Sequence, residues 1–271
     1  MSIALQVALV MVTILVVLLV IGAPIGVAIG MSSAVSMICM IPADVSFATS
    51  AQRIFAGSNS FSLIAIPFFI LAGNIMNNGG IATRLVNCAK VISGRMPGAL
   101  AQSNVVANML FGAISGSGAA AAAAMGGTIG PLEEKEGYDK NYSTAVNVAS
   151  APVGMLIPPS NTMIVYSSVA GSVSIAALFM AGYIPGLLWG GAVMILAGIM
   201  AKKRGYQAEQ RVPVKVALKT FWQAIPSLLL IVIVIGGILG GIFTATEGSA
   251  IAVVYATVLS LSLIHISEPT R

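Results

Sequence analysis

The stretch PGALAQSNVVANMLFGAISGSGAAAAAAMGGTIGP, residues 97–131, decides how this sequence folds. It is apolar enough to enter a membrane, but four small residues at 115–118 interrupt it in the middle. Its two arms, roughly 17 and 13 residues long, fall short of the roughly 20 residues with which a helix crosses the hydrocarbon core. Arg95 precedes the stretch, and the charged run at 133–136 follows it. We therefore predict a re-entrant helical hairpin that dips into the membrane and returns to the same side, with its tip at 115–118.

The composition of the whole chain agrees with a membrane location. Of its 271 residues, 58% are hydrophobic and 8% are charged, with a mean hydropathy of +0.99. An average soluble domain carries about a quarter of its residues as charged side chains. Because so few charges cannot cover a globule of this size, the outer surface must meet the lipid bilayer. We expect an all-α, multi-pass membrane protein: a helical bundle that contains the re-entrant hairpin and one broken transmembrane helix.

A second interruption predicts where that broken helix lies. The apolar run from Asn141 to Gly171 contains the adjacent prolines Pro158 and Pro159. Two prolines in succession remove two backbone donors and favour extended geometry in the residue before each. We expect non-helical backbone at this break, near the middle of the membrane and in contact with the hairpin tip.

The remaining segments divide into further spans and amphipathic connectors. Apolar runs predict spans at 3–22, 26–41, 61–76, 174–201, 225–243 and 248–263, with a more polar connection at 42–59. The chain is accordingly divided into 1–80, scaffold-type transmembrane helices; 81–96, an amphipathic connector; 97–171, the transport-type region; 172–223, a transmembrane helix with a cytoplasmic amphipathic connector at 212–222; 224–261, the start of a second repeat; and 262–271, a non-native tail.

The distribution of positive charge predicts the orientation. If the hairpin returns to its own side, the loops at 79–96, 132–140 and 202–219 share one face, and they hold all the lysines and arginines except Arg53 and Arg271. Basic residues concentrate in cytoplasmic loops, so this face is expected to be cytoplasmic. The net charge of +5 is thus a sign of membrane topology, and no nucleic-acid partner is expected.

The two interruptions supply the candidate functional residues. Broken helices persist in a membrane only where protein or a water-filled cavity surrounds them, and transporters use such breaks to bind ions. The site has no carboxylate and offers neutral oxygen donors, which suits a monovalent cation such as Na⁺. The candidate cation-binding residues are Ser115, Gly116, Ser117, Pro158, Pro159 and Ser160. Residues in their vicinity, or in that of the substrate, are Asn161, Thr162 and Glu247.

Two other interpretations stay open. The small residues at 115–124 are also typical of close helix–helix contacts, so the chain could be a membrane scaffold or assembly subunit without an ion site of its own. Glu247 is either a functional carboxylate or a solvated one at the membrane interface. An enzyme is not expected, because the single His265 has no partner, and Cys39 and Cys88 lie in apolar or amphipathic stretches without metal-ligand spacing. We expect no cofactor.

Several segments together resemble the large permease subunit, of the DctM type, of tripartite ATP-independent periplasmic (TRAP) transporters. They are IPFFILAG at 66–73, FGAISGSGAA at 111–120, GYDK at 137–140, IPPS at 157–160 and the Thr246-Glu247 pair. The resemblance implies an elevator-type symporter in the cell inner membrane, with Na⁺ as coupling ion and an organic acid such as a C4-dicarboxylate or sugar acid as substrate. It also implies two partners, a small DctQ-type membrane subunit and a periplasmic DctP-type binding protein.

Within this family, the hairpin and the broken helix match the Na⁺ site of the first inverted repeat. The family often has Ser or Thr where this chain has Gly118, so one hydroxyl is expected to be missing. The family's large subunit has two inverted repeats, and we expect this chain to be truncated soon after the second begins. Residues 262–271 resemble a translated sequencing adapter and are excluded from the fold prediction.

Overall fold

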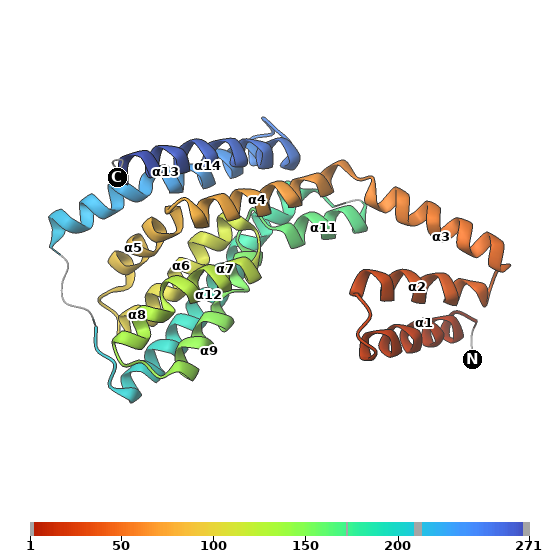
Figure 1. The fold of residues 1–271 in the computed structure, drawn as a ribbon, viewed down its shortest axis with the longest axis horizontal. Coiled ribbons are helices and arrows are strands. Elements are labelled where there is room, and N and C mark those ends of the chain that lie inside the picture. The colour runs from red at the N-terminus through yellow and green to blue at the C-terminus, as the bar shows by residue number, and fades with distance from the viewer. Residues whose placement is uncertain (1–2, 172, 209–212, 268–271) are drawn as a thin grey trace. The chain divides into compact units, whose positions relative to one another are not determined.

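A computed structural model describes residues 3–171, 173–208 and 213–267, and the described part is built of helices without strands. The chain divides into two compact units, Met1–Ser60 and Phe61–Arg271 (Figure 1). The helix that begins near Ala65 therefore belongs with the candidate site and not with the N-terminal helices, although the sequence prediction had grouped it with residues 1–80.

The first unit contains three helices, α1 (Ile3–Val20), α2 (Ile25–Ile38) and α3 (Ala43–Ser58). None of the α1 side chains is buried, as expected for an apolar helix that faces lipid. The hydroxyl of Ser46 on α3 donates to the Ala34 carbonyl on α2 at 2.8 Å. Two expectations need correction here. The polar connection at 42–59 is a helix, and α2, with 14 residues, is shorter than the span predicted at 26–41.

The second unit contains all the other described helices, beginning with η1 and α4. In Figure 1, α14 lies along α4 and beside α13, and both contacts are extensive. The elements are η1 (Phe61–Ile64), α4 (Ala65–Asn78), α5 (Ile81–Ser93), α6 (Ala99–Ser115), α7 (Gly118–Thr128), α8 (Gly130–Lys135), α9 (Lys140–Ser150), α10 (Val153–Leu156), α11 (Asn161–Ala170), α12 (Ile175–Arg204), α13 (Val214–Leu239) and α14 (Ala245–Ser267).

The predicted amphipathic connector at 81–96 is confirmed as helix α5. Its buried face consists of apolar residues three and four positions apart, including Ile81, Leu85, Val86 and Ala89. This spacing places them on one side of an α-helix, where they pack against α6 and α13. Arg84 lies on the exposed side and donates to the Gln223 carbonyl at 3.2 Å.

Helices α6 and α7 form the predicted hairpin. The chain reverses at Gly116, and neither arm is long enough to count among the membrane-spanning helices. The first turns of α6 pack in one apolar cluster with Tyr138 and Tyr142, which follow the second arm. The two ends of the hairpin therefore come back to the same level, which is the geometry of a re-entrant element.

The helix α13 departs from the sequence prediction. A separate connector at 212–222 and a span from Ile225 were expected, but one helix runs from Val214 to Leu239 with Pro226 inside it. Residues 209–212 lie outside the described part of the chain, and so do residues 268–271 of the predicted tail. The rest of that tail continues α14 as far as Ser267.

The number of spans confirms a polytopic helical membrane protein. Five helices of the described chain are long and apolar enough to cross a membrane: α1, η1 with α4, α12, α13 and α14 up to Leu263. The predicted broken helix is the pair Lys140–Leu156 and Asn161–Ala170, bent by 47° at the break, and it makes a sixth span if the two parts cross the membrane together.

Close packing of two glycines joins the hairpin to the broken helix, and it supports a first prediction. A Cβ added at Gly154 would lie 2.6 Å from the Gly112 Cα. Because the two backbones cannot move apart freely, Gly154→Ala is expected to lower the stability of the fold by about 1–3 kcal/mol. The measurement is the thermal unfolding midpoint in detergent.

A control for this variant lies on α7. Gly127 has open space around its Cβ position, so Gly127→Ala should be neutral or stabilising by up to about 1 kcal/mol through helix propensity. If Gly154→Ala melted like the wild type, the close approach of α6 and α10 would be refuted.

Candidate functional site

The hairpin tip is formed by a reversal of the chain between α6 and α7. Gly116 takes a left-handed conformation with φ of +62°, which a residue with a side chain rarely adopts. Ser117 is extended, and its side chain caps α7 by accepting from the Ala120 N–H at 3.3 Å. The Ser115 hydroxyl, which is buried, makes only long contacts of 3.4 and 3.5 Å with the backbone of Ser117. The Ser115 hydroxyl therefore has no short hydrogen bond.

The break in the broken helix lies between α10 and α11. Ile157 and Ser160 are extended, the bond between Pro158 and Pro159 is cis, and these four residues are buried. Ser160 is the N-cap of α11, where its hydroxyl accepts from the Met163 N–H at 3.4 Å and donates to the Met155 carbonyl. The Ser160 side chain thus has a structural task beyond the ion-binding role predicted for it.

The structure brings the tip and the break together, as predicted. The backbone N–H of Asn161 donates to the Gly116 carbonyl at 3.1 Å, and its side-chain Nδ2 donates to the Ser115 carbonyl at 3.4 Å. A Cβ on Gly116 would lie 3.0 Å from the Pro159 carbonyl oxygen. Only glycine fits here, because both the left-handed φ and the approach of the break exclude a side chain.

The junction leaves oxygen atoms free for a cation. Asn161 Oδ1 is buried and has no hydrogen-bond partner. A buried polar atom without a partner costs free energy unless a water or an ion completes its contacts. The neighbouring Ser115 hydroxyl is a second neutral oxygen with only long contacts. Hard, uncharged oxygen ligands of this kind fit an alkali-metal ion.

The other candidate residues differ in their surroundings. Thr162 is exposed on the first turn of α11. Glu247 is exposed at the start of α14, where its carboxylate accepts from the N–H and hydroxyl of Thr244 at 2.7 and 2.9 Å. This arrangement is a capping box, so the structure favours the interpretation of Glu247 as an interfacial residue over a role at the junction. Gly118 packs against the Ala151 carbonyl, which a Cβ would approach to 2.9 Å.

Sequence reasoning missed a polar cluster below the tip. The Asn108 Nδ2 on α6 lies within hydrogen-bond distance of Asn104 Oδ1 at 2.8 Å, Asn147 Oδ1 at 3.0 Å and the Ser150 hydroxyl at 2.8 Å, and its two hydrogens are shared among them. These residues tie α6 to α9. The signal was present in the sequence, since polar residues recur every three or four positions in both helices, and such residues within a membrane usually pair with one another.

The comparison with known proteins decides the family. Residues 12–268 match the family described as tripartite ATP-independent periplasmic transporter, DctM component. The chain belongs to this family. The resemblance found in the sequence is thereby confirmed.

Individual relatives agree with the family assignment. The chain is 54% identical over 229 residues to the protein YgiK of Salmonella typhimurium, covering 84% of this chain and 53% of that one. It is 38% identical to the C4-dicarboxylate TRAP transporter large permease protein DctM of Rhodobacter capsulatus, over 79% of this chain and 51% of the relative. It is 44% identical to the isethionate TRAP transporter permease protein DctMQ of Oleidesulfovibrio alaskensis, over 77% of this chain and 33% of the relative. The chain thus spans about half the length, or less, of these relatives.

Proposed function

We propose that this chain is part of the large permease subunit of a TRAP transporter that takes up an organic acid by Na⁺-coupled symport across the inner membrane. Its relatives are named for C4-dicarboxylate and isethionate, which are small organic anions. The class of substrate proposed here is accordingly a small organic acid. Which acid is carried would depend on residues beyond this junction and on the binding protein that delivers it.

The observation that carries this proposal is the junction between the hairpin tip and the helix break. At the junction, the Asn161 side chain donates to the Ser115 carbonyl through Nδ2, and its buried Oδ1 has no partner. The Ser115 hydroxyl makes only long contacts, of 3.4 and 3.5 Å. Transporters built on inverted repeats bind their coupling ions at interrupted helices of this type. A cation there would be held by α6, α7 and α11 together, so its arrival would stabilise the hairpin against the broken helix.

The proposed partners follow from family membership. We propose that the permease works with a small DctQ-type membrane subunit and a periplasmic DctP-type binding protein. One relative named above is called DctMQ, a name that combines those of the large component, DctM, and the small component, DctQ. A pull-down of the full-length permease with both proposed partners would test this assembly.

The ion site can be tested by removing one oxygen. In the full-length permease, Ser115→Ala is expected to raise the Na⁺ concentration for half-maximal uptake roughly tenfold, because a lost polar contact in a buried site costs about 1–3 kcal/mol. The measurement is the Na⁺ dependence of uptake into proteoliposomes with the small subunit and a loaded binding protein.

A suitable control is Thr128→Val on the second arm, because the Thr128 hydroxyl donates within its own helix to Ala124. This variant should leave the Na⁺ dependence unchanged. The competing interpretation, a scaffold without an ion site, predicts that neither variant alters any response to Na⁺.

A further inference from the structure

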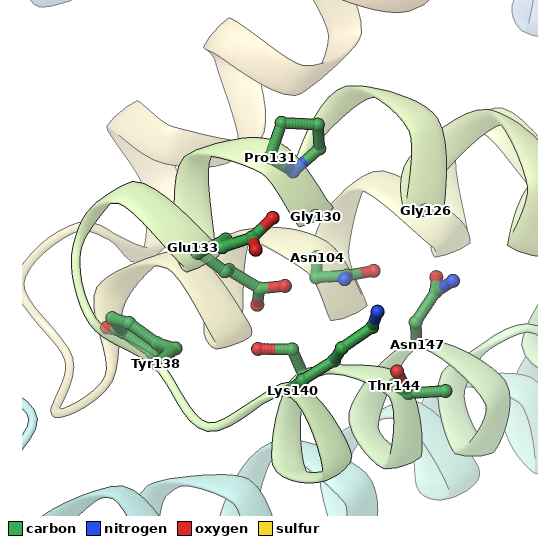
Figure 2. Close-up of a pocket in the computed structure, with 11 residues that line it drawn as sticks. Asn104, Gly126, Gly130, Pro131, Glu133, Tyr138, Lys140, Thr144 and Asn147 are labelled. Atoms are coloured by element: carbon green, nitrogen blue, oxygen red, sulfur yellow. The ribbon is translucent and has the colours of Figure 1, made fainter.

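A second polar site lies at the opposite end of the hairpin from its tip. A cavity of about 380 Å³ opens between α6, α8 and α9, and Figure 2 shows polar side chains gathered around it. Among them are Asn104 from α6, Glu133 from α8 and Lys140 and Thr144 from α9. None of these residues belongs to the tip or to the break.

Glu133 is the unusual member of this cavity. Its side chain is only 1% exposed, and both carboxylate oxygens lack a hydrogen-bond partner. Asn104 Nδ2 and the Ser143 hydroxyl line the same cavity, and these two neutral donors face the carboxylate without a hydrogen bond of good geometry to it. The buried carboxylate therefore has only weak, uncharged neighbours around it.

No basic side chain neutralises this carboxylate. The only ion pair in the described part of the chain joins Arg204 to Asp139 at 3.1 Å. Lys140 lines the cavity without forming an ion pair there, and Glu134 adds a second negative charge at its rim. A buried carboxylate is stable only if it is protonated or paired with a cation. The cavity thus lacks one positive charge.

We propose that this cavity is a binding site for a single monovalent cation, a proton or an alkali-metal ion, whose charged ligand is the Glu133 carboxylate. The Ser143 hydroxyl on α9 supplies a neutral oxygen beside it, and Asn104 Nδ2 on α6 is a hydrogen-bond donor that orients the carboxylate. The site is separate from the one proposed at the hairpin tip and does not rest on it. Because α8 ends the hairpin, the cation would stabilise the base of the hairpin against α6 and α9.

The electrostatics of Glu133 support this assignment. Burial raises the pKa of its carboxyl to about 7, although the nearby Ser143 and Asn104 side chains lower it in part. The other titratable groups near it lie on α8 and its C-cap, in the following turn and on α9, and α6 and α7 contribute none. They are Glu134, Lys135, Glu136, Tyr138, Asp139, Lys140 and Tyr142. Asp139 is the opposite case, since the Tyr142 N–H and Arg204 hold its pKa below the ordinary value.

The raised pKa has a defined effect on stability. Between the ordinary glutamate pKa and about 7, the folded protein binds a proton at Glu133 that the unfolded chain releases. This contribution to stability is therefore present at acidic pH and is lost as the pH rises through about 7. An alkali-metal ion that replaced the proton would restore it.

The test is a titration of the glutamate carboxyls in the full-length permease. The protein, labelled with ¹³C-glutamate and placed in lipid nanodiscs, is followed by NMR in N-methyl-D-glucamine chloride, then in NaCl and in KCl at equal ionic strength. One carboxyl is expected to titrate near neutral pH. This signal should be absent from Glu133→Gln and present in the neighbouring control Glu134→Gln, because Glu134 is exposed.

The salts distinguish the two cations. A midpoint that is the same in all three salts identifies the proton, and a midpoint lowered by NaCl or KCl identifies an alkali-metal ion that competes with it. The salt series is repeated in Ser115→Ala. If the salts shift the midpoint by binding at the hairpin tip, this variant should lose the shift.

One further variant guards against a substitution at 133 that fails to fold. Ser143→Ala should raise the midpoint, since it removes a hydroxyl that favours the charged form. If every glutamate titrated in its ordinary range, with no response to either salt, the proposal would be overturned.

Discussion

Replacing Asn161 by leucine in the full-length permease is expected to raise the Na⁺ concentration for half-maximal uptake on the order of 100-fold, equivalent to about 3 kcal/mol. The substitution keeps the number and branching of the side-chain heavy atoms but removes two polar groups at once. One is Nδ2, which donates to the Ser115 carbonyl, and the other is the buried Oδ1 without a partner. The backbone N–H that donates to Gly116 is retained.

Two measurements separate loss of the ion site from a general defect. A cation that binds only the folded state raises the thermal unfolding midpoint with its concentration. Wild type should show this shift with Na⁺, and Asn161→Leu should lack it. The matched control is Thr162→Val, the next residue along α11, whose side chain is exposed. An unchanged Na⁺ response in Asn161→Leu would show that the Asn161 amide is not part of the ion site.

The hairpin and the broken helix could be predicted because their causes are local. Glycines flanked by serines end one helix and begin the next, and adjacent prolines cannot donate backbone hydrogen bonds. Short apolar arms then leave a re-entrant path as the only one that suits a membrane. The contact between the tip and the break could also be predicted, because exposed backbone groups in a membrane must find hydrogen-bond partners.

Features that depend on tertiary packing could not be predicted in this way. In the run at 133–136 the sequence shows only a charged flank, but the fold buries Glu133 and leaves Glu134 exposed. The connector at 212–222 and the span from Ile225 were expected to be separate, but a single helix, α13, runs through both, with Pro226 inside it. The role of Ser160 as the N-cap of α11 was also not predicted, because it depends on where that helix begins.

Both ends of the hairpin are expected to lie on the cytoplasmic side of the membrane. In a full-length permease without Cys39 and Cys88, cysteines placed at Arg95 and at Glu136 should both react with a membrane-impermeant maleimide from the cytoplasmic side. The two positions flank the hairpin, and its ends lie at one level because the first turns of α6 pack with Tyr138 and Tyr142. Glu136 is preferred to Glu133 for this purpose because Glu133 is buried.

Helix α12 supplies the controls for both sides. It has 30 residues, so it extends about 45 Å at 1.5 Å per residue and exceeds the roughly 30 Å of a hydrocarbon core. Cysteines at Ser174 and Lys203 should be labelled from opposite sides whichever path the hairpin takes, and Lys203 shares the side of Arg95 only if the hairpin is re-entrant. Labelling of positions 95 and 136 from opposite sides would show that α6 and α7 cross the membrane as one span. The orientation of every later helix would then be reversed, and the cation site at Glu133 would face the periplasm.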